Sequence, residues 1–315
     1  MNLVVLCLAA IAMVAVLISA VVGIGLPWLD RFATKLSPRH AARLWLGLAA
    51  LPVLIGVLAA VVSFLPAVGV GHDHCLAHGP HHPHLCPHHF GGAPGIVLVC
   101  IAVLASARIV YVLVAFGRGI QLGHRTSAIL AQASDLHGDA LVFPSGEPQA
   151  FVLGALKPRV HVSRGLLALG PEIVEPVLAH ERVHAIRRDL LWRGLCSVLA
   201  AGHLPLVTRM LQLRLSTAQE IAADAEAAET MLEGRFKLAE ALLLLARISR
   251  ASSLGISFTN GDLKTRVHAL LATERILPTW PKRVLLLSGL ALLTAVGASH
   301  DLIHHGLETL LGSLS

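Results

Sequence analysis

Three residues of one short motif could hold and use a metal ion: His180, Glu181 and His184, in the order HERVH. Helix positions that are four apart lie on one face, one turn from each other, so both imidazoles can reach the same ion. The carboxylate between them then points toward a water molecule beside that ion. Catalytic zinc takes three protein ligands and a water, with a carboxylate as general base. The motif therefore predicts a Zn²⁺ ion bound by His180 and His184, with Glu181 as the catalytic residue.

The downstream segment QEIAADAEAA supplies a candidate for the third zinc ligand, Glu220. Asp224 lies one turn further along the same helix face and would accept a hydrogen bond from a ligand imidazole. A solvated acidic helix is the alternative for this pair. For the HERVH histidines, the alternative is a helix close to the membrane that binds no metal.

The elements that must position these residues can be predicted from residues 118–283. Short β-rich segments, divided by Pro, Gly and Ser, lie near 139–163. A helix should begin at Gly170 and Pro171 and carry HERVH, because Pro costs nothing in the first turn. Further helices should run through 216–248, with a break near Gly234. The region is therefore expected to be an α+β domain with a small sheet.

The rest of the chain is typical of a membrane protein. Of its 315 residues, 55% are hydrophobic and only 14% are charged, well below the quarter usual in soluble domains. Four stretches are long and apolar enough to cross a bilayer, each needing about 20 residues; they are 3–28, 42–65, 94–116 and 284–299. The fold class predicted is thus a mainly α membrane protein with four transmembrane helices and one α+β domain.

The distribution of Lys and Arg sets the orientation of these spans. Residues 29–43 hold four of the 25 and residues 117–283 hold twenty, whereas 66–93 and 300–315 hold none. Cytoplasmic segments carry the basic excess. We therefore expect a multi-pass protein of a bacterial inner membrane with both termini outside. The predicted parts are spans and an external loop at 1–117, a cytoplasmic catalytic domain at 118–283, and a fourth span with an external tail at 284–315.

The apolar segment 190–207 could be mistaken for a fifth span. Arg193, His203 and Pro205 interrupt it, and a crossing would place Glu220 across the bilayer from HERVH. We expect a helix that is buried in the domain or lies against the membrane surface. His203 could donate a hydrogen bond to the oxyanion of a cleaved peptide, or it could be a buried core histidine. Asp189 is expected to form structural ion pairs with Arg187 or Arg188.

These motifs carry a family resemblance. VLAHERVHAIRRD followed by AQEIAADAEA resembles the membrane zinc proteases of the BlaR/MecR signal-transducer type, and more distantly HtpX and Ste24. QAFVLGALKPRVHVSRGLLAL is similar to the family's edge strand and hairpin, and SFTNGDLKTRVHALL to its segment after the ligand helix. The similarity covers roughly residues 1–282. Only residues 299–315 follow the last predicted span, so the family's penicillin-binding sensor domain is not expected in this chain.

The resemblance implies a cytoplasmic gluzincin-like endopeptidase. Substrate would lie extended along an edge strand near 149–154. The protein would relay an external signal by cleaving itself, near Ser257 and Phe258, or by cleaving a cytoplasmic transcriptional repressor, for example one of winged-helix type. Its partners would then be a peptide or protein substrate and the lipid bilayer, without direct nucleic-acid binding. Constitutive quality control of membrane proteins is an alternative function.

Residues 71–90, GHDHCLAHGPHHPHLCPHHF, form a second candidate metal site with eight histidines and two cysteines. The charge distribution places it outside, across the membrane from HERVH. Imidazole and thiolate suit a second Zn²⁺ or a copper ion, with ligands drawn from Cys75, Cys86, His72, His74 and His78. A Cys75–Cys86 disulfide or a low-complexity hairpin are alternatives. A non-proteolytic metal sensor that acts through this loop is therefore a third function to weigh.

Overall fold

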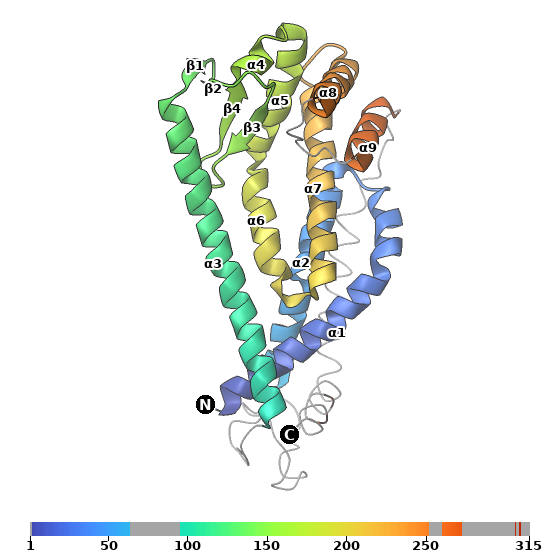
Figure 1. Ribbon diagram of the computed structural model, residues 1–315. Coiled ribbons are helices and arrows are strands. Elements are labelled where there is room, and N and C mark those ends of the chain that lie inside the picture. Colours follow the sequence, from blue (N-terminus) through green and yellow to red (C-terminus); the bar gives the residue numbers. More distant parts are fainter. Residues whose placement is uncertain (1, 64–94, 252–259, 273–305, 307–308, 310–315) are drawn as a thin grey trace.

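The computed structural model describes residues 2–63, 95–251 and 260–272, together with Gly306 and Thr309 (Figure 1). This part of the chain is mainly helical, with one small mixed sheet. The predicted fourth span at 284–299, the histidine-rich tract and residues 252–259 lie outside the described residues. The predicted combination of long apolar helices with a small α+β region is confirmed for the residues that the structure describes.

Three helices are long and apolar enough to cross a membrane: α1 (Asn2–Ala33), α2 (Pro38–Ser63) and α3 (Ile96–Gln132). They match the first three predicted spans, but α3 continues far beyond the predicted end at residue 116. Its 37 residues extend about 55 Å at 1.5 Å per residue, well over the ~30 Å of a bilayer core. The predicted boundary at 117/118 thus falls inside one continuous helix, which leads directly to the sheet.

The sheet has the strand order β1-β2-β4-β3. Its strands are β1 (Asp135–His137), β2 (Ala140–Phe143), β3 (Ala150–Leu153) and β4 (Arg159–Ser163). β3 and β4 form the predicted antiparallel hairpin, and β4 runs parallel to β2. β3 is therefore an edge strand of the described sheet, as expected for 149–154. Val160 and Val162 face a core that the sheet shares with the next long helix.

The short helix α4 (Arg164–Leu167) leads from the sheet to α5 (Pro171–Arg187), and the Ser163 side chain caps α4. Pro171 occupies the first turn of α5, as predicted. Ile173, Val174, Val177 and Leu178 bury one face of α5 against the sheet and α8 (Gly234–Ala251). Arg188 then adopts a left-handed conformation with φ 55°, which separates α5 from α6 (Asp189–Leu199).

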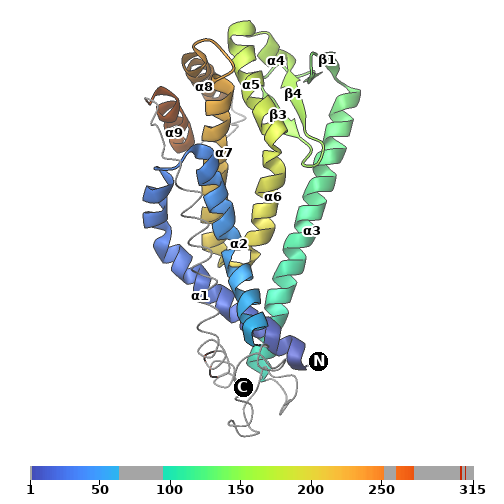
Figure 2. The same ribbon diagram turned by 180° about the vertical axis from the view of Figure 1, so that it is seen from behind.

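Residues 190–207 form a helical hairpin rather than the single buried or surface-lying helix that we expected. α6 leads through a 3-10 turn, η2 (Ala200–Gly202), into α7 (Pro205–Ala228). Figures 1 and 2 show α6 and α7 running beside α2 and α3. Pro205 prevents a continuous helix, and Gly202 lets the turn approach Pro52 and Val53 of α2 closely. Because α7 runs back alongside α6, the beginning of α6 and the end of α7 lie at the same end of the helical bundle.

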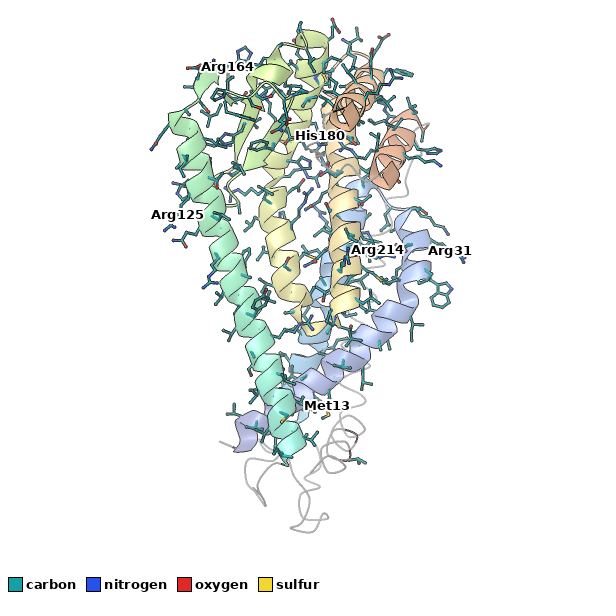
Figure 3. The ribbon with its side chains drawn as sticks, in the orientation of Figure 1. Met13, Arg31, Arg125, Arg164, His180 and Arg214 are labelled. Carbon is teal, nitrogen blue, oxygen red and sulfur yellow. The ribbon has the colours of Figure 1, made fainter. Side chains whose placement is uncertain are left out.

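Two sets of contacts tie α7 to the first two spans. Arg214 donates to both carboxylate oxygens of Asp30 in α1 at 2.6 Å, and its guanidinium lies 5.6 Å from the centre of the Trp45 ring in α2. Arg39 of α2 forms an ion pair with Glu226 near the end of α7. Between these contacts, α7 packs along α2 through Leu215 and Ala218, which belong to a shared apolar core. Figure 3 shows Arg214 midway along α7.

The remaining described helices cover the end of α7 next to α5. α7 ends at Ala228 and α8 begins at Gly234, which matches the predicted break. α9 (Asn260–Leu271) packs with α8 and α7 around Ala223, Leu238 and Leu263. These helices help to bury the HERVH segment of α5.

Candidate active site

His180 and His184 form the centre of the site. They lie one turn apart on α5, and their Nε2 atoms are 3.1 Å apart. Both side chains are buried, and their rings meet edge to face. His180 lies at the end of the bundle far from Met13 (Figure 3). The helical spacing thus brings the two imidazole nitrogens together, as the motif predicts.

Glu220 of α7 faces this histidine pair. Its Oε2 atom lies 3.4 Å from Nε2 of His180, and its Oε1 atom lies 3.5 Å from Nε2 of His184. One ligand atom from each of the three residues falls within 4.8 Å of the others. Tetrahedral ligands at 2.0–2.1 Å from zinc would lie about 3.3 Å apart. Each Glu220 oxygen lies near this distance from one of the two histidines, and the 4.8 Å limit on the three ligand atoms leaves them close enough to hold one metal ion.

Two aspartates lie beside the other nitrogens of the imidazoles. Oδ2 of Asp189 lies 2.7 Å from Nδ1 of His184 in a hydrogen bond, which directs Nε2 of His184 toward Glu220. Oδ1 of Asp224 lies 2.8 Å from Nδ1 of His180 as an ion pair that does not have hydrogen-bond angles. Asp224 takes the place proposed for it from the sequence. Asp189 is also 3.6 Å from Arg187, its predicted partner, but its closer contact with His184 was not predicted.

Arg266 of α9 completes the buried charge cluster. Its Nε and Nη2 atoms donate to the two Asp224 oxygens at 2.7 and 2.6 Å, and Nη1 lies 3.1 Å from Glu220. The residue is only 4% exposed. Sequence reasoning placed Arg266 in a family-like segment but gave it no role. Its helix also carries Lys264, so the local sequence does not distinguish Arg266 as a residue of the site.

Arg193 of α6 contacts Glu220 from another direction. Its Nη2 atom donates to Glu220 at 2.7 Å, and its Nε donates to the Gln219 side chain at 2.8 Å. Glu220 is therefore fixed between two guanidinium groups. This arrangement holds its carboxylate in front of the histidine pair.

Charged neighbours outweigh burial in setting the pKa values of His180 and Glu220. Burial lowers the pKa of His180, but the Asp224 and Glu220 carboxylates more than reverse this and raise it to about 9. Burial raises the pKa of Glu220, but His180, His184 and Arg266 hold it well below its usual range. The site therefore stabilises ionised carboxylates and positive charge beside them.

Glu181 is half-buried on α5, beside the histidine pair. Burial raises its pKa above the usual value for a glutamate, although His180 and His184 act in the opposite direction. A raised carboxylate pKa brings the group closer to neutral pH, where a general base works best. Glu181 therefore has both the position in the motif and the environment that a proton-transferring residue needs.

The structure does not bring His203 to this cluster. His203 lies beyond the opposite end of α6, where Nδ1 contacts the Ser19 hydroxyl at 3.1 Å and Nε2 donates to the Leu48 carbonyl at 2.9 Å. Both nitrogens are thus occupied by the spans, in agreement with the alternative of a buried core histidine. The proposed self-cleavage pair Ser257 and Phe258 lies outside the described residues. So do Cys75, Cys86, His72, His74 and His78.

Comparison with known proteins identifies the family of the chain. A family profile described as BlaR1 peptidase M56 matches residues 95–270, which include α3, the sheet and all the helices that carry the cluster. No curated protein and no solved structure matches the chain. The profile covers more than half of the chain. The chain therefore belongs to the BlaR1 peptidase M56 family, a family of membrane-associated metallopeptidases.

Proposed function

We propose that this protein is a membrane-embedded zinc endopeptidase with a gluzincin-like domain. The observation that carries the proposal is the spacing of three donor atoms, from His180, His184 and Glu220, which suits a tetrahedral ion. Zinc bound there would act as a Lewis acid toward a peptide carbonyl and lower the pKa of a water molecule. Asp189, Asp224 and Arg266 would keep the ligands in place.

Glu181 would move the proton during catalysis. Its carboxylate would accept a proton from the attacking water and then donate it to the amine of the departing peptide. The partly desolvated environment of Glu181, which raises its pKa, supports this role. The substrate would lie extended along β3, at 149–154, as an added strand. β3 is an edge of the described sheet and packs beside α5.

Signal transduction is the biological role that we favour. The family suggests a membrane-associated peptidase in signal transduction. The distribution of Lys and Arg supports a catalytic region in the cytoplasm and a histidine-rich tract outside a bacterial inner membrane. Cleavage of the chain itself near Ser257 and Phe258, or of a winged-helix repressor, would carry the signal inward. Zn²⁺ or copper at the external tract is the proposed stimulus. Quality-control proteolysis is the second candidate, and the attachment of α7, which carries Glu220, to the candidate spans α1 and α2 supports it.

The test is replacement of Glu181 by Gln in the full-length protein, reconstituted in vesicles. The variant should retain one zinc ion per chain, measured by mass spectrometry of the metal, and should lose peptide cleavage. Absence of cleavage by the wild-type protein would overturn the endopeptidase proposal and favour a non-proteolytic metal sensor. Equal cleavage by both proteins would overturn the role of Glu181. Comparison of cellular proteomes with and without this substitution would then separate a single repressor target from many membrane-protein targets.

A further inference from the structure

A groove of about 530 Å³ opens between α3, α6 and α7, immediately beside the end of β3. Residues 152–155 border one end of the groove, and Arg108 and Thr208 lie at the other. Fifteen positions of α3 separate Gly123, beside β3, from Arg108. At 1.5 Å per residue the groove therefore follows α3 for about 22 Å. It leads from the proposed peptide-binding strand into the depth of the spans.

The walls of the groove are apolar and leave room for a chain. Tyr111 is 73% exposed, and Phe116 and Leu190 line the same space. Gly119 also lines it, and a Cβ atom built at this position would meet nothing within 4 Å. Small residues of this kind allow another backbone to approach closely within a membrane. The groove thus suits an apolar polypeptide segment.

The far end of the groove carries a positive charge. Arg108 lies within the apolar part of α3, and its Nη2 atom is 3.3 Å from the Thr208 hydroxyl. Among the residues that the structure describes, no carboxylate forms an ion pair with Arg108. A cation within a span is costly unless it is paired or hydrated. A carboxylate on the occupant of the groove would supply the missing counter-charge.

We propose that this groove receives a membrane-inserted segment of the substrate, with an acidic side chain of that segment facing Arg108. The proposal rests on the endopeptidase function above and adds a substrate class to it: membrane-anchored polypeptides with a carboxylate in the inserted part, which is the class that the quality-control candidate requires. The carboxylate should lie about 7 residues from the segment that pairs with β3 if the chain is extended, or about 15 if it is helical. An anionic lipid fits less well, because its headgroup remains at the membrane surface whereas Arg108 lies within the span.

Filling the groove tests this proposal. The probes are β-casein in solution and a fusion of one casein segment to a single apolar span that carries one Glu. Gly119→Phe should lower the ratio of fusion cleavage to casein cleavage about tenfold, a transition-state difference of about 1.4 kcal/mol. Gly117→Phe is the matched control, because Gly117 lies on the same helix, does not line the groove and has open space around its Cβ. An unchanged ratio in Gly119→Phe would overturn the proposal.

Removal of the positive charge of Arg108 is the second test of the proposal. Wild type should cleave the Glu fusion faster than the same fusion with Gln, by about tenfold. Arg108→Gln should remove this preference, and Arg108→Lys should keep most of it. Arg118→Gln is the control, since Arg118 is exposed on the same helix outside the groove. A preference that survives in Arg108→Gln would overturn the proposal.

The two tests also distinguish failure of the endopeptidase proposal, failure of the proposed substrate class, and a lipid as the occupant of the groove. If wild type cleaves neither probe, the endopeptidase function itself fails, and if Glu181→Gln cleaves both, the role of Glu181 fails. If cleavage requires Glu181 but Gly119→Phe and Arg108→Gln behave as wild type, only the substrate class fails. Dependence of both probes on the anionic lipid content of the vesicles, lost in Arg108→Gln, would assign the groove to a lipid and overturn the proposal.

Discussion

Oδ2 of Asp189 lies 2.7 Å from Nδ1 of His184, across the break between α5 and α6. The contact depends on Arg188, whose left-handed conformation turns the chain so that the first residue of α6 faces back toward α5. Asp224 of α7 lies beside Nδ1 of His180 as an ion pair. Each imidazole of the cluster therefore has a carboxylate from a different helix beside it.

Asp189→Asn should weaken zinc binding by about 10- to 100-fold, because it removes the charge that orients the His184 ring and increases its basicity. The measurement is competition with a chromogenic chelator for zinc. Asp139→Asn serves as the matched control, because Asp139 forms an exposed ion pair with Arg182. Equal zinc affinity in Asp189→Asn and wild type would contradict the role assigned to Asp189.

Arg266→Met should destabilise the protein by about 3–5 kcal/mol, since it leaves the buried Asp224 carboxylate and part of Glu220 without their partner. Arg266→Lys should recover only part of this stability, because one ammonium cannot replace a two-pronged guanidinium contact. Thermal unfolding in detergent checks both variants. Arg182→Gln, at an exposed ion pair, should change stability by less than about 1 kcal/mol. A loss of stability below about 1 kcal/mol in Arg266→Met would show that the charge cluster does not depend on Arg266.

Removal of zinc by 1,10-phenanthroline should abolish cleavage and lower the unfolding temperature. A ligand at 1,000 times its dissociation constant stabilises a protein by about 4 kcal/mol, so the change should be measurable. Added Zn²⁺ should restore both properties, whereas Mg²⁺ should not, because two imidazoles disfavour a cation that prefers oxygen ligands. Full activity after removal of all transition metals would be incompatible with the proposed chemistry.

His161 should make the stability of the catalytic region depend on pH. It is fully buried on β4, where its Nε2 atom lies 3.2 Å from the Ser127 hydroxyl of α3. Burial, with a smaller contribution from Arg159, lowers the pKa of His161 below 6.5. The unfolded chain therefore binds more protons below pH 6.5, so stability is retained above this pH and is lost as the pH falls toward the lowered value.

The slope expected from this one group is at most about 1.4 kcal/mol per pH unit. Urea unfolding between pH 5.0 and 7.5 should show a shallower pH dependence in His161→Leu than in wild type. Val162→Ala, on the same strand and also fully buried, should lower stability by a similar amount at every pH. Identical slopes for wild type and His161→Leu would assign the pH dependence to other groups.

Local patterns allowed much of the architecture to be predicted. Pro171 and the apolar spacing of α5 predicted where that helix begins and which face it buries. The spacing of His180 and His184 predicted their approach, and the acidic segment of α7 predicted that Glu220 and Asp224 share a face. These inferences depend on helix geometry within one element. They needed no knowledge of how separate elements pack.

The parts that could not be predicted depend on tertiary structure. The contact of Asp189 with His184 requires a positive φ at Arg188, a conformation that an arginine rarely adopts. Arg266 reaches Asp224 only because α9 packs on α7, and nothing in its local sequence specifies that contact. Hydropathy showed that 190–207 is apolar, but not that it doubles back as a hairpin beside α2.

The attachment of α7 gives the protein a mechanical property. Glu220 shares α7 with Arg214, which is bonded to Asp30 of α1, while His180 and His184 lie on α5; Glu226 of α7 pairs with both Arg39 of α2 and Arg187 of α5. A tilt of α1 and α2 within the bilayer would therefore move α7 with them. It would displace Glu220 relative to the two histidines without first deforming the sheet. A change in membrane thickness that tilts these helices is therefore expected to change the spacing of the three proposed zinc ligands.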